Sequence, residues 1–356
     1  MKAVRFYASR DVRFEDVAAP GEIGPNQILM KPSLCGICGT DLHEYIDGPH
    51  WTPRPRNEFS GATLPQILGH EFAGEVLEVG RDVRRLKAGD RVSIQPQVGS
   101  PTDYFGRRGY FHFSPTSAAI GLSWPWGGMG ELAVVNEMNA IRMPDEVTDQ
   151  QGAMAEPAAV AVQSVDRGGV RSGDTVLVTG AGPIGALVAM AAVAAGAAKV
   201  IVSEVSPGRR DRIAALNVAS NILDPTDDDF VAQVIDQTEE RVGVDVAIEC
   251  SGNARALQQC MQLTRAQGTV VVTGNVHGSV SLTPFEWILK GLSIHATLCY
   301  PTDMWPRIYK MMASGKFPVE KLIDKVIHGK DIVAEGFQPL LDPQSSTMKI
   351  LVRCID

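Results

Sequence analysis

The sequence predicts an α/β protein with two domains, one of them built on a doubly wound parallel sheet. Its 356 residues exceed one ordinary domain and suit two. A change of pattern near residue 158 separates them. Upstream, Gly- and Pro-rich sequence with short strand-like runs predicts irregular β structure. Downstream, apolar strands alternate with helices, which is typical of a parallel sheet covered on both faces.

The elements follow in a regular order. The first part has strand-like runs at 74–80 and 90–94. The second part is predicted to contain strand 175–179, helix 184–196, strand 199–204, helix 209–216, strand 244–249, helix 254–265 and strand 268–274. After the run 292–300 we expect helix 304–314 and the closing strand 348–354. We expect the last strand to rejoin the first domain. The predicted boundaries are 1–157 for the β-rich domain, 158–296 for the parallel-sheet domain and 297–356 for the return.

Composition excludes several classes of protein. The net charge of −8, with short basic clusters only at 106–110 and 208–212, argues against nucleic-acid binding. The apolar stretch 175–202 is long enough for a membrane span, but its order of β-branched run, glycine cluster and alanine-rich run predicts strand, loop, helix and strand. The charged start lacks a secretory signal, and six scattered cysteines do not form a disulfide framework. We therefore expect a cytoplasmic protein without a membrane segment.

A glycine loop predicts dinucleotide binding. Gly180, Gly182 and Gly185 have the GxGxxG spacing, with Pro183 and Ile184 inside it, after a predicted strand and at the start of a helix. The first glycine permits the tight turn, the second lets the backbone approach a pyrophosphate, and the third allows helix and strand to pack closely. The helix N-terminus then faces the phosphates. This is the loop of a Rossmann domain.

The residues after the next strand bear on cofactor choice. Glu204 lies about 20 residues beyond the loop, where a carboxylate accepts the adenosine ribose hydroxyls and repels a 2′-phosphate. Arg209 and Arg210 lie close by and could accept such a phosphate instead. The carboxylate favours NAD over NADP.

The stretch "CGICGTDLHEYIDGP" raises the question of what its cysteines do. Cys35 and Cys38 could be a redox pair, a metal clip, or one ligand and one bystander. His70 and Glu71 in "LGHEFAGEV", and Glu156 in "AMAEPAAVAV", add side chains of the types that bind zinc.

These stretches together resemble a known family. "CGICGTDLHEYIDGP", "LGHEFAGEV", "EPAAVAV", "GAGPIG" and "VDVAIECSG" occur in the order found in zinc-dependent medium-chain alcohol dehydrogenases. The sequence is most similar to the 2,3-butanediol dehydrogenase and sorbitol dehydrogenase branch. The resemblance implies a GroES-like catalytic domain joined to the Rossmann domain, and a homodimer or homotetramer.

The resemblance also assigns roles by position. The implied zinc ligands are Cys38, His70, Glu71 and Glu156, while Cys35 matches no ligand. Thr40 and His43 match the relay that carries the alcohol proton to solvent. Thr273 and Asn275 in "VTGNV", and Leu298 and Tyr300 in "TLCY", match positions along the nicotinamide.

The implied activity is NAD-dependent oxidation of a secondary alcohol in a small vicinal diol, or reduction of a hydroxyketone. Cys299 stands where sorbitol dehydrogenases have an arginine, which argues against a long polyol. Alternatives are a polyol, cyclitol or amino-alcohol dehydrogenase, or a non-catalytic relative that binds NAD. Candidates for an aromatic pocket wall are Tyr45, Trp51, Trp124, Trp126 and Tyr300.

The segment 95–123 departs from the family because it contains no cysteine. Relatives commonly bind a structural zinc there through four cysteines. We therefore expect one catalytic zinc and no structural zinc. Its aromatic residues could fill the lobe, face another subunit or cover the active-site mouth: Tyr104, Phe105, Tyr110, Phe111 and Phe113.

Overall fold

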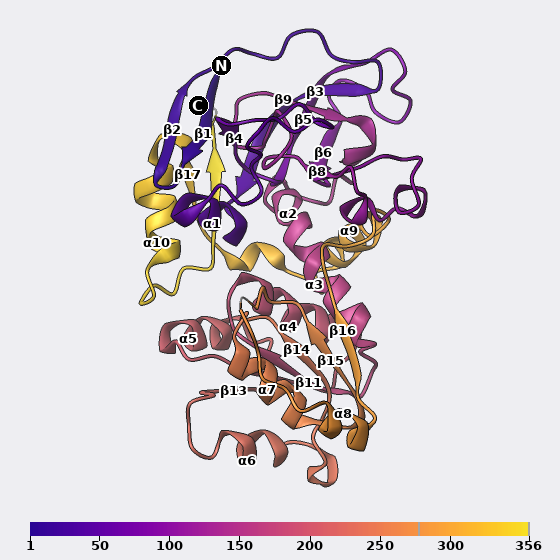
Figure 1. The fold of residues 1–356 in the computed structure, drawn as a ribbon, viewed down its shortest axis with the longest axis vertical. Coiled ribbons are helices and arrows are strands. Elements are labelled where there is room, and N and C mark those ends of the chain that lie inside the picture. The colour runs from indigo at the N-terminus through magenta and orange to yellow at the C-terminus, as the bar shows by residue number, and fades with distance from the viewer. Residues whose placement is uncertain (277, 355–356) are drawn as a thin grey trace.

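The computed structural model describes residues 1–276 and 278–354, as a β-rich upper part and a parallel-sheet lower part (Figure 1). Helix α3 (Ala155–Gly168) runs between the two parts, and the chain returns to the upper part through α9 (Trp305–Ala313). We propose that the dinucleotide-binding domain spans 158–296, between these two connections.

The lower part is a six-stranded parallel sheet in the order β13-β12-β11-β14-β15-β16. Its strands are β11 (Thr175–Thr179), β12 (Lys199–Ser203), β13 (Asn221–Leu223), β14 (Val244–Glu249), β15 (Thr264–Val272) and β16 (Ser293–Ala296). The predicted doubly wound sheet is confirmed. The order reverses between β11 and β14, and ligands bind beyond the carboxyl ends of the strands at such a switch point. The three-residue β13 was not predicted, because it is too short to show a pattern.

Helices cover the sheet: α4 (Pro183–Ala195), α5 (Pro207–Leu216), α6 (Phe230–Ile235), α7 (Ala254–Leu263) and α8 (Pro284–Lys290). The apolar stretch 175–202 folds as β11, α4 and β12, as its order of residues predicts. Among the described residues, no helix has the length and apolarity needed to cross a membrane. The short helices α6 and α8 were not predicted.

The upper part contains a sheet in the order β10-β6-β5-β3-β18-β17, with β9 also paired to β3. Its strands are β3 (Gln27–Gly36), β5 (Glu71–Val79), β6 (Arg91–Ile94), β9 (Ala133–Asn136), β10 (Ala140–Arg142), β17 (Ile323–His328) and β18 (Lys349–Arg353). Smaller sheets pair β1 (Lys2–Ala8) with β2 (Asp11–Asp16) and β4 (Gln66–Ile67), and β7 (Gln97–Val98) with β8 (Ala118–Ala119). Helices α1 (Gly39–Asp47), α2 (Asp149–Ala153) and α10 (Gln338–Leu341) complete this part. The C-terminal strand β18 therefore lies between β3 and β17.

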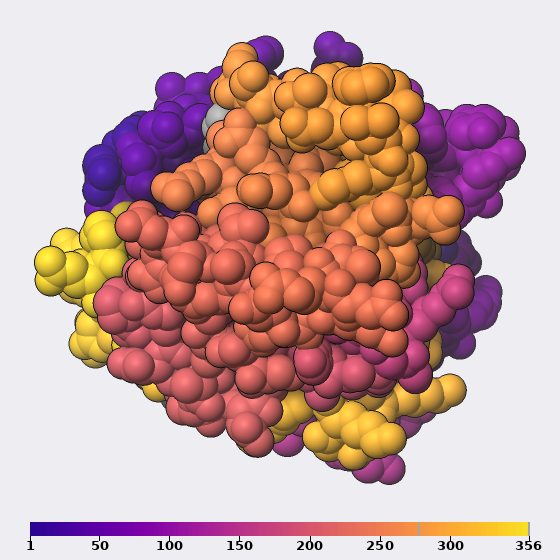
Figure 2. Space-filling view, turned by 90° about the horizontal axis from the view of Figure 1, so that it is seen from below, coloured from indigo at the N-terminus to yellow at the C-terminus, as the bar shows by residue number. Residues whose placement is uncertain are grey.

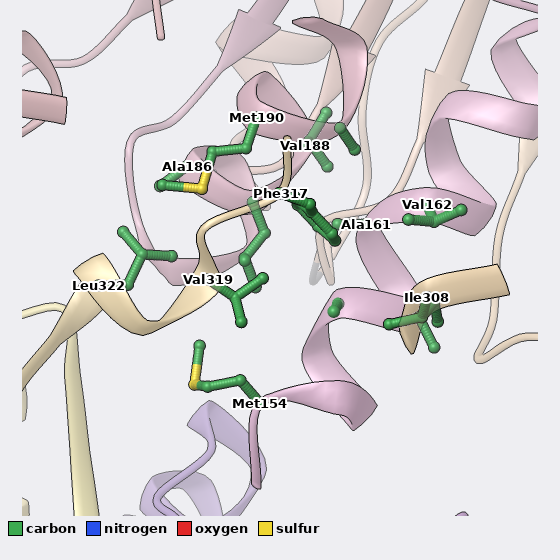
Figure 3. Close-up of a cluster of buried hydrophobic side chains, with 14 of the residues drawn as sticks. Met154, Ala161, Val162, Ala186, Val188, Met190, Ile308, Phe317, Val319 and Leu322 are labelled. Atoms are coloured by element: carbon green, nitrogen blue, oxygen red, sulfur yellow. The ribbon is translucent and has the colours of Figure 1, made fainter. Parts of the chain in front are cut away.

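A hydrophobic cluster continues through the junction of the two parts (Figure 3). Helix α3 packs against both α4 and α9. Met190 on α4, Ile308 on α9 and Phe317 beyond it are buried in this cluster. Burial at this density fixes α3 against both parts, and α3 carries Glu156 in its first turn.

Candidate active site

The two cysteines of the "CGIC" stretch have different surroundings. Cys35 belongs to β3, and its side chain is fully buried in the core of the β-rich part. Cys38 follows the end of β3 and is the N-cap residue of α1, where it is only partly buried. Both are free thiols. This arrangement favours one ligand and one bystander over a two-cysteine clip.

Strand pairing brings the other candidate ligands to Cys38. Gly36 of β3 lies opposite Glu71 of β5, so His70 and Glu71 lie beside the start of α1. One potential ligand atom from each of Cys38, His70 and Glu71 lies within 4.8 Å of the other two. The fourth predicted ligand, Glu156, approaches from α3, close enough for its charge to act on His70.

Asp41, which was not among the predicted site residues, contacts both Cys38 and His70. It is fully buried, and its Oδ2 accepts a hydrogen bond of 2.9 Å from the backbone N–H of Cys38. Its Oδ1 lies 3.7 Å from Nδ1 of His70, and neither of these buried atoms has a hydrogen-bond partner. A histidine whose Nδ1 faces a carboxylate presents Nε2 to a metal. The signal in the sequence was an acid three residues after Cys38, on the first turn of a helix.

A buried lysine also binds Glu71. Nζ of Lys349, on β18, donates to Oε2 of Glu71 and to the carbonyl of Ile37, the latter at 3.0 Å. The side chains of Lys349 and Glu71 are 2% and 1% exposed. A β-carbon at Gly36 would overlap Oε2 of Glu71, so the pair requires glycine there.

The charges of the cluster fit a cation. Three acids, Asp41, Glu71 and Glu156, are buried beside the partly buried Cys38, and Lys349 is the buried ammonium among them. Buried charges persist when they are paired or bind a metal. Thiolate, imidazole and carboxylate are the ligands of catalytic zinc sites. The residues present therefore fit a zinc ion.

Glu156 bonds a residue that was predicted to serve another part of the site. Tyr300, predicted to lie along the nicotinamide, is fully buried, and its hydroxyl donates to Oε1 of Glu156 at 2.7 Å. Burial raises the pKa of the Glu156 carboxyl above its ordinary value. The structure thus gives Tyr300 a contact with a candidate metal ligand.

The two predicted relay residues lie on one face of α1. Oγ1 of Thr40 lies 3.7 Å from Sγ of Cys38. His43 follows three residues later, a spacing that places it on the same helix face, and it is exposed. A path from the metal cluster to solvent along α1 is therefore short.

The glycine loop opens onto a cavity of about 450 Å³ at the switch point of the sheet. Gly180 has φ 89°, and a β-carbon at Gly185 would overlap the Gly180 carbonyl, so both positions need glycine. Gly182 lines the cavity and is the N-cap residue of α4, which begins with Pro183 and Ile184. Backbone N–H groups at a helix start suit a pyrophosphate.

Glu204 and Arg209 also line this cavity. Glu204 is 6% exposed, and its carboxylate accepts hydrogen bonds from the backbone of Ala181 (2.7 Å) and Ser206 (2.9 Å). Arg210 instead pairs with Asp224 at 2.6 Å. Of the two arginines considered as phosphate acceptors, only Arg209 lines the cavity.

The remaining cofactor candidates follow β15 and β16. The Thr273 hydroxyl bonds that of Ser164 at 3.0 Å, and the backbone of Asn275 packs on Gly252. Leu298 is 50% exposed and lines a second cavity, of about 360 Å³.

Aromatic residues of the segment 95–123 line that second cavity together with residues of α3 and of the end of β16. Phe111 is buried, whereas Tyr104 and Phe113 are 61% and 47% exposed. The segment therefore fills its lobe only in part. Of the candidates for an aromatic pocket wall, Tyr45 packs in the β-rich core against Phe337, and Trp51 is 61% exposed.

Comparison with known proteins gives two family matches. Residues 24–145 match the model described as "Alcohol dehydrogenase GroES-like domain", and residues 183–314 match "Zinc-binding dehydrogenase". The expected GroES-like domain is thereby confirmed. The chain is 36% identical to (R,R)-butanediol dehydrogenase of Bacillus subtilis (strain 168), over 99% of both chains.

Solved structures agree with these matches. The crystal structure of 2R,3R-butanediol dehydrogenase from Bacillus subtilis superposes with a TM-score of 0.92 at 35% identity, covering 99% of each chain. A putative zinc-binding dehydrogenase from Sinorhizobium meliloti 1021, bound to NADP, gives a TM-score of 0.87 at 30% identity, over 99% of this chain and 98% of that one.

Proposed function

Because this chain belongs to the zinc-dependent medium-chain alcohol dehydrogenases, we propose that it interconverts a small vicinal diol and its hydroxyketone, such as 2,3-butanediol and acetoin, with NAD as cofactor. The observation that carries the proposal is the group of partly buried Cys38 with buried His70 and Glu71. The full-length similarity to a butanediol dehydrogenase supports the choice of substrate.

Different residues of the chain would bind the metal and orient its ligands. Cys38, His70, Glu71 and Glu156 would hold the zinc, and Asp41 orients His70. When bound, zinc supplies a Lewis acid that acidifies the alcohol, and NAD supplies the hydride acceptor.

The proton and the cofactor are handled by different elements. Thr40 accepts the proton of the substrate hydroxyl and passes it to His43, which releases it at the surface of α1. Gly182 and Glu204 bind the pyrophosphate and the adenosine ribose. The carbinol carbon loses a hydride and its hydroxyl loses a proton, which yields the ketone.

The activity is tested with a panel of diols, polyols, cyclitols and amino alcohols, each with NAD and NADP, by the absorbance of the reduced cofactor. We expect the highest kcat/KM with 2,3-butanediol and NAD. Faster turnover of a polyol, cyclitol or amino alcohol would replace the proposed substrate. No turnover of any alcohol by zinc-loaded protein would indicate a non-catalytic relative.

Cofactor preference depends on the Glu204 charge. We expect Glu204→Gln, which keeps the size and one acceptor oxygen, to narrow the preference for NAD over NADP about tenfold, because a bond to a charged acceptor contributes about 1.5–3 kcal/mol. The measurement is the ratio of kcat/KM for the two cofactors. Adding Arg209→Gln to the Glu204→Gln variant should reverse part of its gain in kcat/KM with NADP. A wild-type protein that already prefers NADP would contradict the proposal.

We propose that the protein is a homodimer joined through β16 and α8. Strand β16 is at the edge of the parallel sheet, where an unpaired strand invites pairing. Helix α8 exposes Phe285 (63%), Ile288 (74%) and Leu289 (69%). The orange segment that contains α8 and β16 forms the upper part of the surface in Figure 2. An apolar face of this kind suits a second copy.

Ile288→Glu should convert the dimer to a monomer, because the contact would bury an unpaired charge. Light scattering after size-exclusion chromatography measures the mass. Leu77→Glu, at an exposed position of β5 (40%), is the matched control and should leave the dimer intact. An unchanged mass in Ile288→Glu would locate the interface elsewhere.

We place the protein in a reducing cytoplasm. All six cysteines are free thiols in the structure, and a reducing compartment maintains that state.

A further inference from the structure

We propose that Tyr300 is a positioning residue that holds the Glu156 carboxylate for the metal through its hydroxyl. The inference rests on the proposed zinc site. It assigns a task to a residue expected, from family resemblance, along the nicotinamide.

The contact is specific and enclosed. Tyr300 is fully buried, Glu156 is 8% exposed, and the hydroxyl lies 2.7 Å from Oε1. Within residues 1–276 and 278–354, Glu156 makes no other side-chain hydrogen bond. One carboxylate oxygen is therefore fixed by Tyr300, and Oε2 has no hydrogen bond to the described residues.

The Tyr300 ring is also held by contacts that do not involve its hydroxyl. The ring packs on Trp305 with 5.1 Å between centroids. The Trp305 indole N–H donates to Oγ of Ser93 at 2.8 Å, and that oxygen lies 2.6 Å from the Tyr309 hydroxyl. These contacts tie the segment after β16 to β6 of the upper sheet. A phenylalanine at position 300 would keep these ring contacts while losing the bond of the hydroxyl to Glu156 and its contact with Gln97.

The backbone before Tyr300 also directs it inward. Cys299 has φ 52°, a left-handed conformation that residues other than glycine rarely adopt. Across this residue the chain changes from Leu298, half exposed, to Tyr300, fully buried. Such conformations are kept where the surrounding structure enforces them, often at functional sites.

Loss of the hydroxyl should weaken metal binding. Without it, Glu156 must be oriented by the metal alone, and groups that orient metal ligands are worth about 10–100-fold in metal affinity or activity. We expect Tyr300→Phe to raise the zinc dissociation constant about tenfold. Turnover should fall, while the KM for NAD stays unchanged because the dinucleotide cavity is separate.

The matched control is Tyr309→Phe. Tyr309 is 3% exposed, and its hydroxyl bonds Ser93 and the carbonyl of Ile141 (3.2 Å), so this variant loses an equally buried hydroxyl without touching a candidate ligand. Zinc affinity is measured by competition with a chromophoric chelator, without substrate. This readout separates failure of the inference from failure of the proposed diol activity.

A double-mutant cycle completes the test. Tyr300→Phe should have no further effect on zinc affinity in a Glu156→Gln background, because the carboxylate that it positions is gone. Equal weakening in the Tyr300 and Tyr309 variants, or additive effects of Tyr300→Phe and Glu156→Gln, would overturn the proposal. A Tyr300→Phe protein that loses its circular dichroism signal would also overturn it, because the hydroxyl would then support the fold.

Discussion

Cys38→Ser should lower kcat/KM by on the order of 10³-fold or more, about 4 kcal/mol of transition-state stabilisation. Cys38 contributes the only thiol to the group with His70 and Glu71. A serine hydroxyl is not ionised at neutral pH and is a poorer ligand for zinc than a thiolate. Metal content after dialysis should fall together with turnover, because the same change removes ligand and charge.

Cys35 provides the control for this experiment. It is three residues away but fully buried in the β-rich core. Cys35→Ala is preferable to serine, since a hydroxyl at that apolar position would need a partner. We expect Cys35→Ala to lose about 1–2 kcal/mol of stability and to keep most of its turnover and zinc. Equal losses of zinc in both variants would restore the two-cysteine clip.

The fold followed from local pattern. The strands β11, β12 and β14 are apolar runs of five or six residues, and glycine-rich turns or helices of different periodicity separate them. The glycine loop was recognisable because the constraints on it are local. Gly180 has φ 89°, and a β-carbon at Gly185 would overlap the Gly180 carbonyl. Short elements such as β13 and α6 were missed, since a few residues carry no measurable period.

The partners of the site residues could not be predicted in the same way. Lys349 and Glu71 are separated by 278 residues, and Tyr300 and Glu156 by 144. The first pair depends on β18 joining the upper sheet beside β3, and the second on how the segment before α9 packs against α3. Local periodicity contains no such information. The family resemblance supplied candidate ligands but not the groups that orient them, of which Asp41 is the nearest in sequence.

The same buried charges determine what removal of the metal should do. Asp41, Glu71 and Glu156 are buried beside Cys38, with Lys349 as their buried ammonium. Without a cation, the repulsion between these carboxylates and the free-energy cost of burying them are less well compensated. Free zinc at a concentration 1,000 times its Kd stabilises the folded state by about 4 kcal/mol, and chelation should remove this contribution. We expect the Tm to fall while the far-ultraviolet circular dichroism stays nearly unchanged, because hydrophobic packing sustains the sheets and helices.

Zinc stoichiometry should be one per chain, and chelation should abolish turnover. The segment 95–123 has no cysteine, and among good borderline ligands it offers His112 alone. The ring of His112 packs 4.2 Å from that of Phe113, and burial lowers its pKa to about 4. One histidine among aromatic rings does not make the closed four-ligand sphere of a structural zinc.

Elemental analysis of fresh protein measures the ratio of zinc to protein chains, and restored activity after adding zinc to the chelated enzyme is the control. Two zinc ions per chain would require a second site, and turnover in zinc-free protein would remove the metal from the mechanism.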